Sequence, residues 1–109
     1  MSDHFYPADG MKYMRKLRDL RPELFKAFAT FDAKVFEEGA LSVKVKELIA
    51  VATAHLTQCP YCIDIHTKKA VEAGATEEEV AESIFVAMAL RAGGSWAHST
   101  VAMHALEQK

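Results

Sequence analysis

The sequence lacks the features that mark several classes of protein. Its longest apolar run, Ile84 to Leu90, is far too short to span a bilayer. Residues 1–10 contain no apolar segment of the kind that a secretory signal peptide requires. No block of Lys or Arg stands out and the formal net charge is −2, which argues against a nucleic-acid or anionic-membrane surface. We therefore expect a cytoplasmic location, with no nucleic acid and no membrane as partners.

Two cysteines in 109 residues are too few for a disulfide-stabilised scaffold. A chain of this length, 50% hydrophobic and 26% charged, is typical of an ordinary globular protein, and we expect a single domain over residues 1–109. In a reducing compartment, a close cysteine pair is more often a redox or metal site than a structural bridge. A glycine-rich phosphate loop is also missing, so no nucleotide or flavin cofactor is implied.

The alternation of apolar and polar residues that marks strands is absent, whereas apolar residues at helical spacing recur along the chain. The spacing and capping residues predict three helices in the first half of the chain: over 11–20 with Asp9 as cap, from Pro22 to Gly39, and over 43–56 with Ser42 as cap. A fourth helix is predicted from the cysteine segment to Gly74, and a fifth from a Thr76/Glu79 capping box to Leu90. A last helix is predicted over 95–106, after a break at Gly93-Gly94. The predicted fold class is all-α, a compact bundle of five to six helices.

The stretch from Ile84 to Leu90 is apolar on every side of its helix, so it must be covered all round. In so short a chain, one way to cover it is against another subunit. The sequence therefore predicts a homo-oligomer.

The chemistry of the chain concentrates in Cys59-x-x-Cys62-x-x-x-His66. The positive end of a helix dipole at the cysteines stabilises a thiolate, and their spacing lets one sulfur attack a substrate while the other closes a disulfide. His66 follows Cys62 by one helical turn, with Cβ atoms roughly 5–6 Å apart. The dipole favours Cys59 as the attacking thiolate and the histidine favours Cys62; for peroxide chemistry we choose Cys62, because His66 moves a specific proton.

Other interpretations of these residues remain open. Cys59, Cys62 and His66 are three plausible zinc ligands, with His55 as a fourth, although structural zinc sites usually show two separated ligand pairs. From spacing alone, Glu47 is a solvated helix charge. We assign no role to His98 and His104, because a lone helical histidine is more often structural.

Glu47 is followed, twelve residues later, by Cys59-Pro60-Tyr61-Cys62 and then by His66. This pattern resembles that of the alkylhydroperoxidase D (AhpD-like) branch of the carboxymuconolactone decarboxylase family, over about residues 42–92. The resemblance implies an all-helical AhpD-like fold with the Cys-x-x-Cys pair at a helix N-terminus. Short members of the family are homo-oligomers, so we expect a hexamer first and a trimer next.

The resemblance also implies a role for each residue. Cys62 is the peroxidatic cysteine, Cys59 the resolving cysteine, and His66 relays the proton of Cys62 with Glu47 behind it. Tyr61 stands where the best-known member carries a histidine; a phenol is a poor base at neutral pH, so we expect Tyr61 to line the pocket.

The function expected is that of an alkylhydroperoxidase-like oxidoreductase with peroxiredoxin-type antioxidant activity. Its redox-active dithiol serves in place of a cofactor, and its partners are a hydroperoxide and a dithiol or lipoyl-type reductant. The alternatives are a lyase like carboxymuconolactone decarboxylase, which needs no dithiol, and a non-enzymatic zinc-binding or interaction module.

Overall fold

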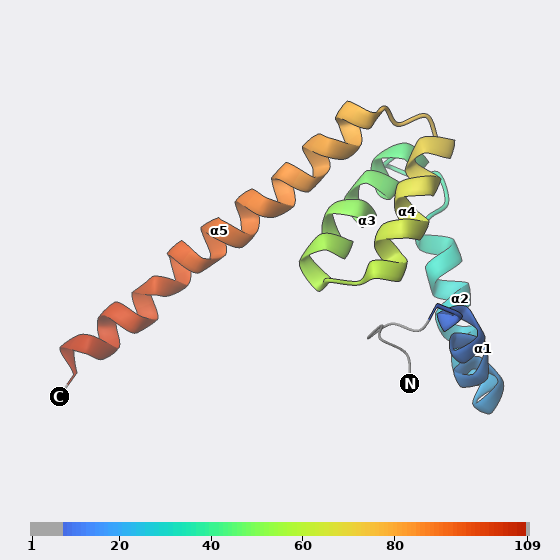
Figure 1. Ribbon diagram of the computed structural model, residues 1–109, viewed down its shortest axis with the longest axis horizontal. Coiled ribbons are helices and arrows are strands. Elements are labelled where there is room, and N and C mark those ends of the chain that lie inside the picture. Colours follow the sequence, from blue (N-terminus) through green and yellow to red (C-terminus); the bar gives the residue numbers. More distant parts are fainter. Residues whose placement is uncertain (1–7, 109) are drawn as a thin grey trace. The chain divides into compact units, whose positions relative to one another are not determined.

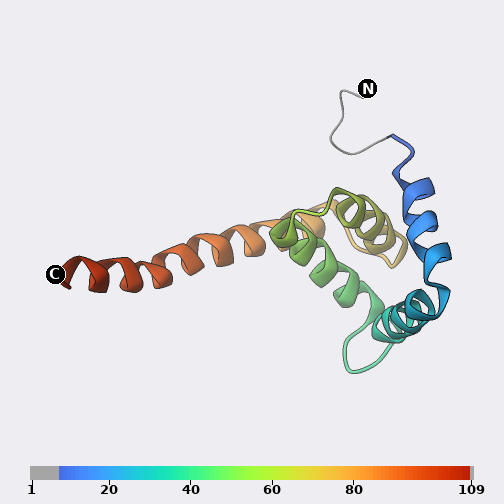
Figure 2. The same ribbon diagram turned by 90° about the horizontal axis from the view of Figure 1, so that it is seen from below.

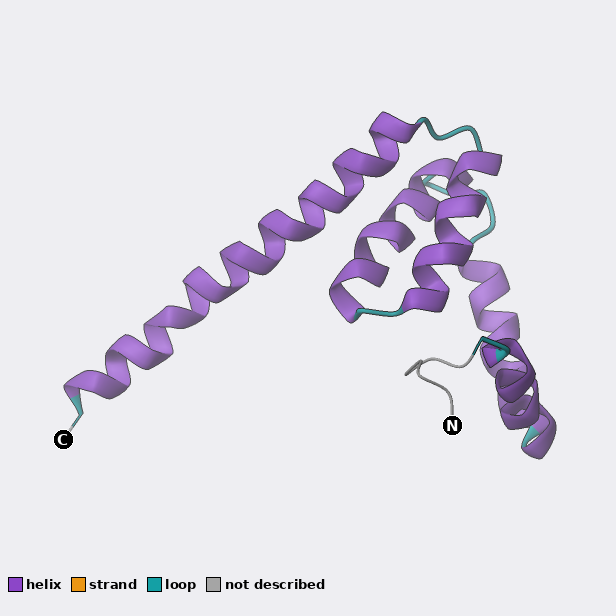
Figure 3. Cartoon of the chain, in the orientation of Figure 1, coloured by secondary structure: helices purple, strands orange, loops and turns teal. Residues whose placement is uncertain are grey.

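The computed structural model describes residues 8–108, and within this range all regular structure is helical (Figures 1 and 3). The helices are α1 (Gly10–Leu20), α2 (Pro22–Val35), α3 (Val43–Thr57), α4 (Pro60–Glu72) and α5 (Glu77–Glu107). The prediction of an all-α fold with five to six helices is therefore confirmed, with five.

The chain divides into two compact units, residues 1–37 and residues 38–109. The first unit contains α1 and α2, and the second contains α3, α4 and α5 with both cysteines. The expectation of one domain over residues 1–109 stays a prediction.

The first unit follows the predicted helix starts more closely than the predicted end. Asp9 lies at the N-cap of α1, but its side chain makes no capping hydrogen bond, and Pro22 is the first residue of α2 as expected. The prediction that α2 runs to Gly39 is wrong, because the helix ends at Val35. The backbone N–H of Glu37 bonds to the carbonyl of Lys34, a tightened final turn that ends the helix before the glycine.

Helices α3 and α4 form an antiparallel pair whose ends are fixed by local chemistry (Figures 1 and 2). The Ser42 hydroxyl accepts the N–H of Val45 at 3.2 Å, which confirms Ser42 as the cap of α3. Gly74, with a φ of +98°, closes α4 as predicted. The N–H of Ala75 bonds to the carbonyl of Ala70 at 2.9 Å, and that of Gly74 to Val71 at 3.0 Å, which is the Schellman arrangement.

The buried core of the second unit is small and lies between α3 and its two neighbours. Val51, Ala70 and Ala75 are buried together, and Leu48, Val80 and Ile84 pack against them. Helix α3 contacts both α4 and α5, whereas α4 and α5 contact each other much less. The first half of α5 lies beside α3, and its second half extends past the pair (Figures 1 and 2).

The predicted break at Gly93-Gly94 does not exist, and the expected last helix over 95–106 is the continuation of α5. Helix α5 runs unbroken for 31 residues. A glycine inside a helix costs about 1 kcal/mol relative to alanine, which weakens a helix without ending it. Over residues 8–108, no helix is both long enough and apolar enough to cross a membrane.

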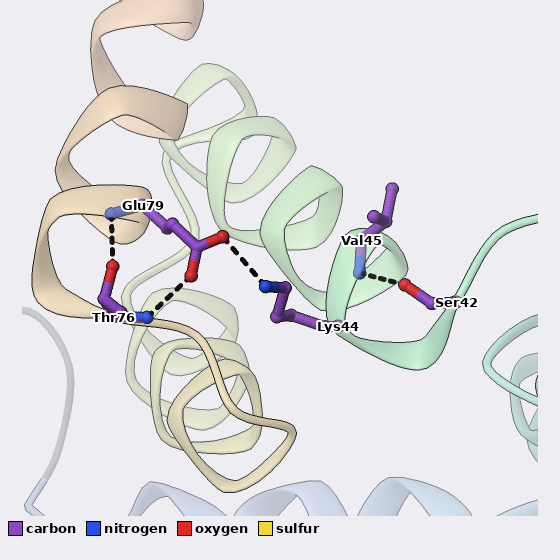
Figure 4. A network of polar contacts seen from close by, with 5 residues as sticks. All are labelled: Ser42, Lys44, Val45, Thr76 and Glu79. Atoms are coloured by element: carbon purple, nitrogen blue, oxygen red, sulfur yellow. Dashed lines mark hydrogen bonds and ion pairs between the residues drawn. The ribbon is translucent and has the colours of Figure 1, made fainter.

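Helix α5 begins with the predicted capping box, which also joins it to α3 (Figure 4). The Thr76 hydroxyl accepts the N–H of Glu79 at 3.1 Å, and the Glu79 carboxylate accepts the N–H of Thr76 at 2.9 Å. The other oxygen of Glu79 pairs with the Lys44 ammonium at 2.9 Å. The bond from Lys44, followed by the bond from Thr76, holds the pKa of Glu79 below its ordinary value.

This network predicts an acid-sensitive component of stability. Because the pKa of Glu79 is lower in the folded state, its stabilising contribution is complete above the pKa of the unfolded state and is lost as the pH falls through the folded pKa. Glu79→Gln keeps an oxygen for Thr76 but loses the charge. We expect urea unfolding to show the variant less stable than wild type at neutral pH, with the difference disappearing in acid as the pH falls through the folded pKa of Glu79. Glu78→Gln, in the same first turn, is the control, and a pH-independent difference for Glu79→Gln would contradict the assignment.

Candidate active site

The two cysteines lie at the start of α4, where the sequence predicted them. Cys59 is the N-cap residue in an extended conformation, and its sulfur accepts the backbone N–H of Cys62 at 3.3 Å. Pro60 opens the helix at a position where its missing N–H costs nothing. The backbone N–H groups of Tyr61 and Cys62, in the first turn, are directed at the sulfur of Cys59.

The sulfurs of Cys59 and Cys62 lie 2.7 Å apart and share a hydrogen bond in which either thiol can donate. Neither cysteine forms a disulfide, and both are half-buried. When Cys59 is ionised, the Cys62 thiol is the donor, and this bond holds the pKa of Cys59 below its ordinary value. Burial opposes the shift, and the backbone N–H groups of Cys62 and Tyr61 reinforce it. The pair is arranged to carry one negative charge and one proton between two sulfurs.

The other predicted residues, Glu47 and His66, meet across the interface of α3 and α4. Nδ1 of His66 and Oε2 of Glu47 lie 2.7 Å apart, although the residues are 19 positions apart in sequence. The Glu47 side chain is 4% exposed and that of His66 is 18% exposed. A carboxylate at this depth requires a hydrogen-bonding partner, and His66 supplies one. An Nδ1–H facing an ionised carboxylate is the donor, which directs Nε2 away from Glu47.

Helix α4 relates this pair to the cysteines. Cys62 and His66 are one turn apart on the same helix, so their Cβ atoms lie roughly 5–6 Å apart on one face. Residues from two helices thus form a short series, from the Glu47 carboxylate through the His66 imidazole to the Cys62 and Cys59 sulfurs. Such a series can move a proton away from, or back to, a reacting sulfur.

Tyr61 lies within the first turn of α4, half-buried, and its backbone N–H contributes to the lowered pKa of Cys59. The zinc interpretation needs three or four ligands together, and residues 8–108 contain no such cluster of His, Cys, Asp or Glu. Nδ1 of His55 lies 2.8 Å from the carbonyl of Val51 on its own helix, and Nδ1 of His98 lies 3.0 Å from that of Gly94.

One residue near this site was not singled out from the sequence. The guanidinium of Arg91, on α5, donates a hydrogen bond to the carbonyl of Leu56 in the last turn of α3. One feature of the sequence could have drawn attention to Arg91. It is the only Asp, Glu, Lys or Arg between Glu82 and Glu107.

This all-helical chain belongs to the carboxymuconolactone decarboxylase family, whose family model matches residues 22–107. It is 48% identical over 82 residues to a Paracoccus denitrificans protein named uncharacterized protein 4 in cox locus, covering 75% of this chain and 74% of the relative. The sequence-based resemblance is thereby confirmed at the level of the family.

Solved structures agree with this membership. A carboxymuconolactone decarboxylase family protein from Legionella pneumophila is similar at 36% identity and a TM-score of 0.71, over 92% of this chain and 89% of that one. A protein from Methanobacterium thermoautotrophicum is similar at 35% identity and a TM-score of 0.74, over 79% and 97% of the two chains.

The contact between Glu47 and His66 predicts how the thiols respond to pH. If His66 accepts a proton from Cys62, then His66→Ala should move the pH–rate profile for alkylation of Cys62 to higher pH, with Cys59 replaced by serine throughout. Glu47→Gln keeps the shape but loses the charge that stabilises the imidazolium, so its shift should be smaller and in the same direction. His55→Ala, on the same helix as Glu47, is the control. Superimposable profiles for wild type, His66→Ala and Glu47→Gln would exclude the relay.

Proposed function

We propose that this protein is a thiol-dependent hydroperoxidase of the AhpD-like type, with Cys59 and Cys62 as its redox centre. The observation that supports it best is the 2.7 Å approach of the two sulfurs at the N-terminus of α4, with the buried contact between Glu47 and His66 on the adjoining turn. A lyase needs neither a close dithiol nor a thiolate-stabilising helix start, so the dithiol chemistry favours the oxidoreductase.

The reaction has three balanced steps. The thiolate of Cys62 attacks the outer oxygen of a hydroperoxide, the O–O bond breaks, and the products are a sulfenic acid and an alcohol, whose proton comes from His66. The Cys59 thiolate then attacks the Cys62 sulfur, which forms the disulfide and releases water once a proton joins the leaving hydroxide. Finally, an external dithiol reduces the disulfide and is itself oxidised to a disulfide.

Two observations favour different cysteines as the sulfur that attacks the hydroperoxide. The pKa of Cys59 is lowered, first by the hydrogen bond from Cys62, which makes that sulfur easier to ionise than an ordinary cysteine. Cys62, however, shares a helix face with His66 and lies within a hydrogen bond of Cys59, which can accept its proton. The charge can therefore pass to Cys62 by a short proton shift. We keep Cys62 as the peroxidatic residue because it has two proton acceptors nearby.

The cysteine variants test the function and the roles together. Cys62→Ser should abolish consumption of cumene hydroperoxide supported by dithiothreitol. Cys59→Ser should leave one round of reaction and then accumulate sulfenic or overoxidised Cys62, because the resolving thiol is missing. Mass spectrometry of the protein after mild peroxide checks both. Overoxidation mainly at Cys59 would reverse the roles, and turnover of carboxymuconolactone without thiol-dependent peroxide loss would favour the lyase.

We also propose that the protein works as a homo-oligomer, with a hexamer favoured and a trimer next. Eight large apolar side chains of α5 are 56–81% exposed in the single chain: Phe85, Val86, Met88, Leu90, Trp96, Val101, Met103 and Leu106. Exposed apolar surface on this scale marks a protein interface. A second copy of the chain is the occupant that the continuous apolar helix supports.

The assembly is tested by changing one exposed position of this helix. Leu90→Glu should lower the mass measured by light scattering at micromolar concentration, because it places a charge within a buried interface. Lys69→Glu, at an exposed position of α4, is the control and should keep the mass of wild type. Gly93→Ala gives a second measurement of the same mass. Gly93 has open space around it in the single chain, so alanine there should stabilise the helix of a monomer. If the proposed interface brings another helix close to Gly93, the added methyl group should weaken that contact and lower the mass. A stable wild-type monomer would contradict the proposal.

A further inference from the structure

Arg91 is an isolated cation on α5. It is exposed in the single chain, and the helix carries no other Asp, Glu, Lys or Arg from Ser83 to Leu106. Its guanidinium donates to the backbone carbonyl of Leu56, which belongs to another helix and is 35 positions away in sequence. The side chain is thus held at a defined place, at the C-terminal end of α3.

That end of α3 is also where the chain turns into the cysteine segment. Gln58 adopts a left-handed conformation with φ of 59°, and the N–H of Cys59 folds back onto the carbonyl of Ala54 at 3.1 Å. The carbonyls of Ala54 and Leu56 belong to the same helical turn and lie roughly 5–6 Å apart. The guanidinium of Arg91 and the backbone of Cys59 therefore contact the same turn of α3.

The charges around the cysteines distinguish Arg91 from its neighbours. Glu47 pairs with His66, and Asp64 of α4 pairs with Lys68 at 3.0 Å. Within residues 8–108, Arg91 makes no ion pair, and its contact with Leu56 uses one of the five N–H donors of a guanidinium. The remaining donors form a fork that matches the two oxygens of a carboxylate.

We propose that Arg91 binds the carboxylate of a small acidic dithiol and so directs this reductant to Cys59. The proposal rests on the proposed function, and it adds that Cys59, the resolving cysteine, is the sulfur that the reductant attacks. One thiolate of the dithiol attacks the Cys59 sulfur, the Cys59–Cys62 bond breaks, and Cys62 leaves as a thiolate that takes up a proton. The second thiol of the reductant, after losing its proton, displaces Cys59, which leaves an oxidised cyclic disulfide and the reduced enzyme.

The test compares dihydrolipoate with dihydrolipoamide, which carry the same dithiol but end in a carboxylate and an amide. The full-length protein is oxidised with diamide, and the second-order rate constant for reduction of its disulfide is measured with each. We expect wild type to prefer dihydrolipoate about fivefold, the size of a solvent-exposed charge-assisted contact. Arg91→Gln, which still donates to Leu56, should lose the preference, and Arg91→Lys should retain part of it.

Two controls make the outcome decisive. Lys69→Gln removes an exposed cation of α4 and should keep the preference; its loss there would mean that overall charge, rather than Arg91, is responsible. High salt should abolish the wild-type preference, which tests the proposal even where the Arg91 variants fold poorly. Equal rates for the two reductants in wild type, or equal slowing of both by Arg91→Gln in a folded protein, would overturn the proposal. Peroxide consumption with neutral dithiothreitol separately tests the proposed function, so the two can fail independently.

Discussion

Glu47 is a carboxylate buried between two helices, and the position of the site depends on the hydrogen bond that satisfies it. Its partner, His66, lies on α4, so the bond fixes α4 against α3 at the depth where the imidazole faces the carboxylate. Removing either side chain would leave the other polar group poorly compensated, which is costly in a buried place. Val51 and Ala70, one turn beyond each partner, belong to the buried core, so the polar contact and the apolar packing share the same helix faces.

The thiols take their properties from a different part of the same hairpin. The link between α3 and α4 is only Gln58 and Cys59, so Cys59 must serve both as the end of the turn and as the cap of α4. Its sulfur therefore receives the first-turn N–H groups, while Cys62 is placed one turn before His66. The bond from Cys62, and then the backbone N–H groups, make the Cys59 sulfur easier to ionise. Cys62 shares a helix face with His66, which contacts the buried Glu47 carboxylate. In the proposed mechanism, a proton would pass between these two sulfurs across their 2.7 Å contact.

Local chemistry made much of the fold predictable from the sequence. The predicted capping residues each affect only the backbone within about one helical turn. Each lies at the helix end where the sequence predicted it: Ser42, Pro60, Gly74 and the Thr76–Glu79 box. The wrong predictions both came from glycines, at Gly39 and at Gly93-Gly94, because glycine permits a helix end without requiring one.

Contacts between distant residues were harder to predict. The pairing of Glu47 with His66 was expected only from a family resemblance, since spacing alone left Glu47 as a solvated charge. The bond from Arg91 to Leu56 has no local signal at all, because it depends on how α5 crosses the end of α3.

The second half of α5 has little within the second unit to stabilise it. On the C-terminal side of Arg91, no described side chain of α5 hydrogen-bonds another helix. Residues 95–108 are all exposed in the single chain. An isolated helix shorter than about 12–15 residues is marginal in water, and two glycines lower its stability further. The distal half also carries Trp96, Val101 and Leu106, each more than two-thirds exposed. In the proposed assembly, a second copy of the chain would cover these side chains, and the same apolar residues would then stabilise α5 across Gly93-Gly94.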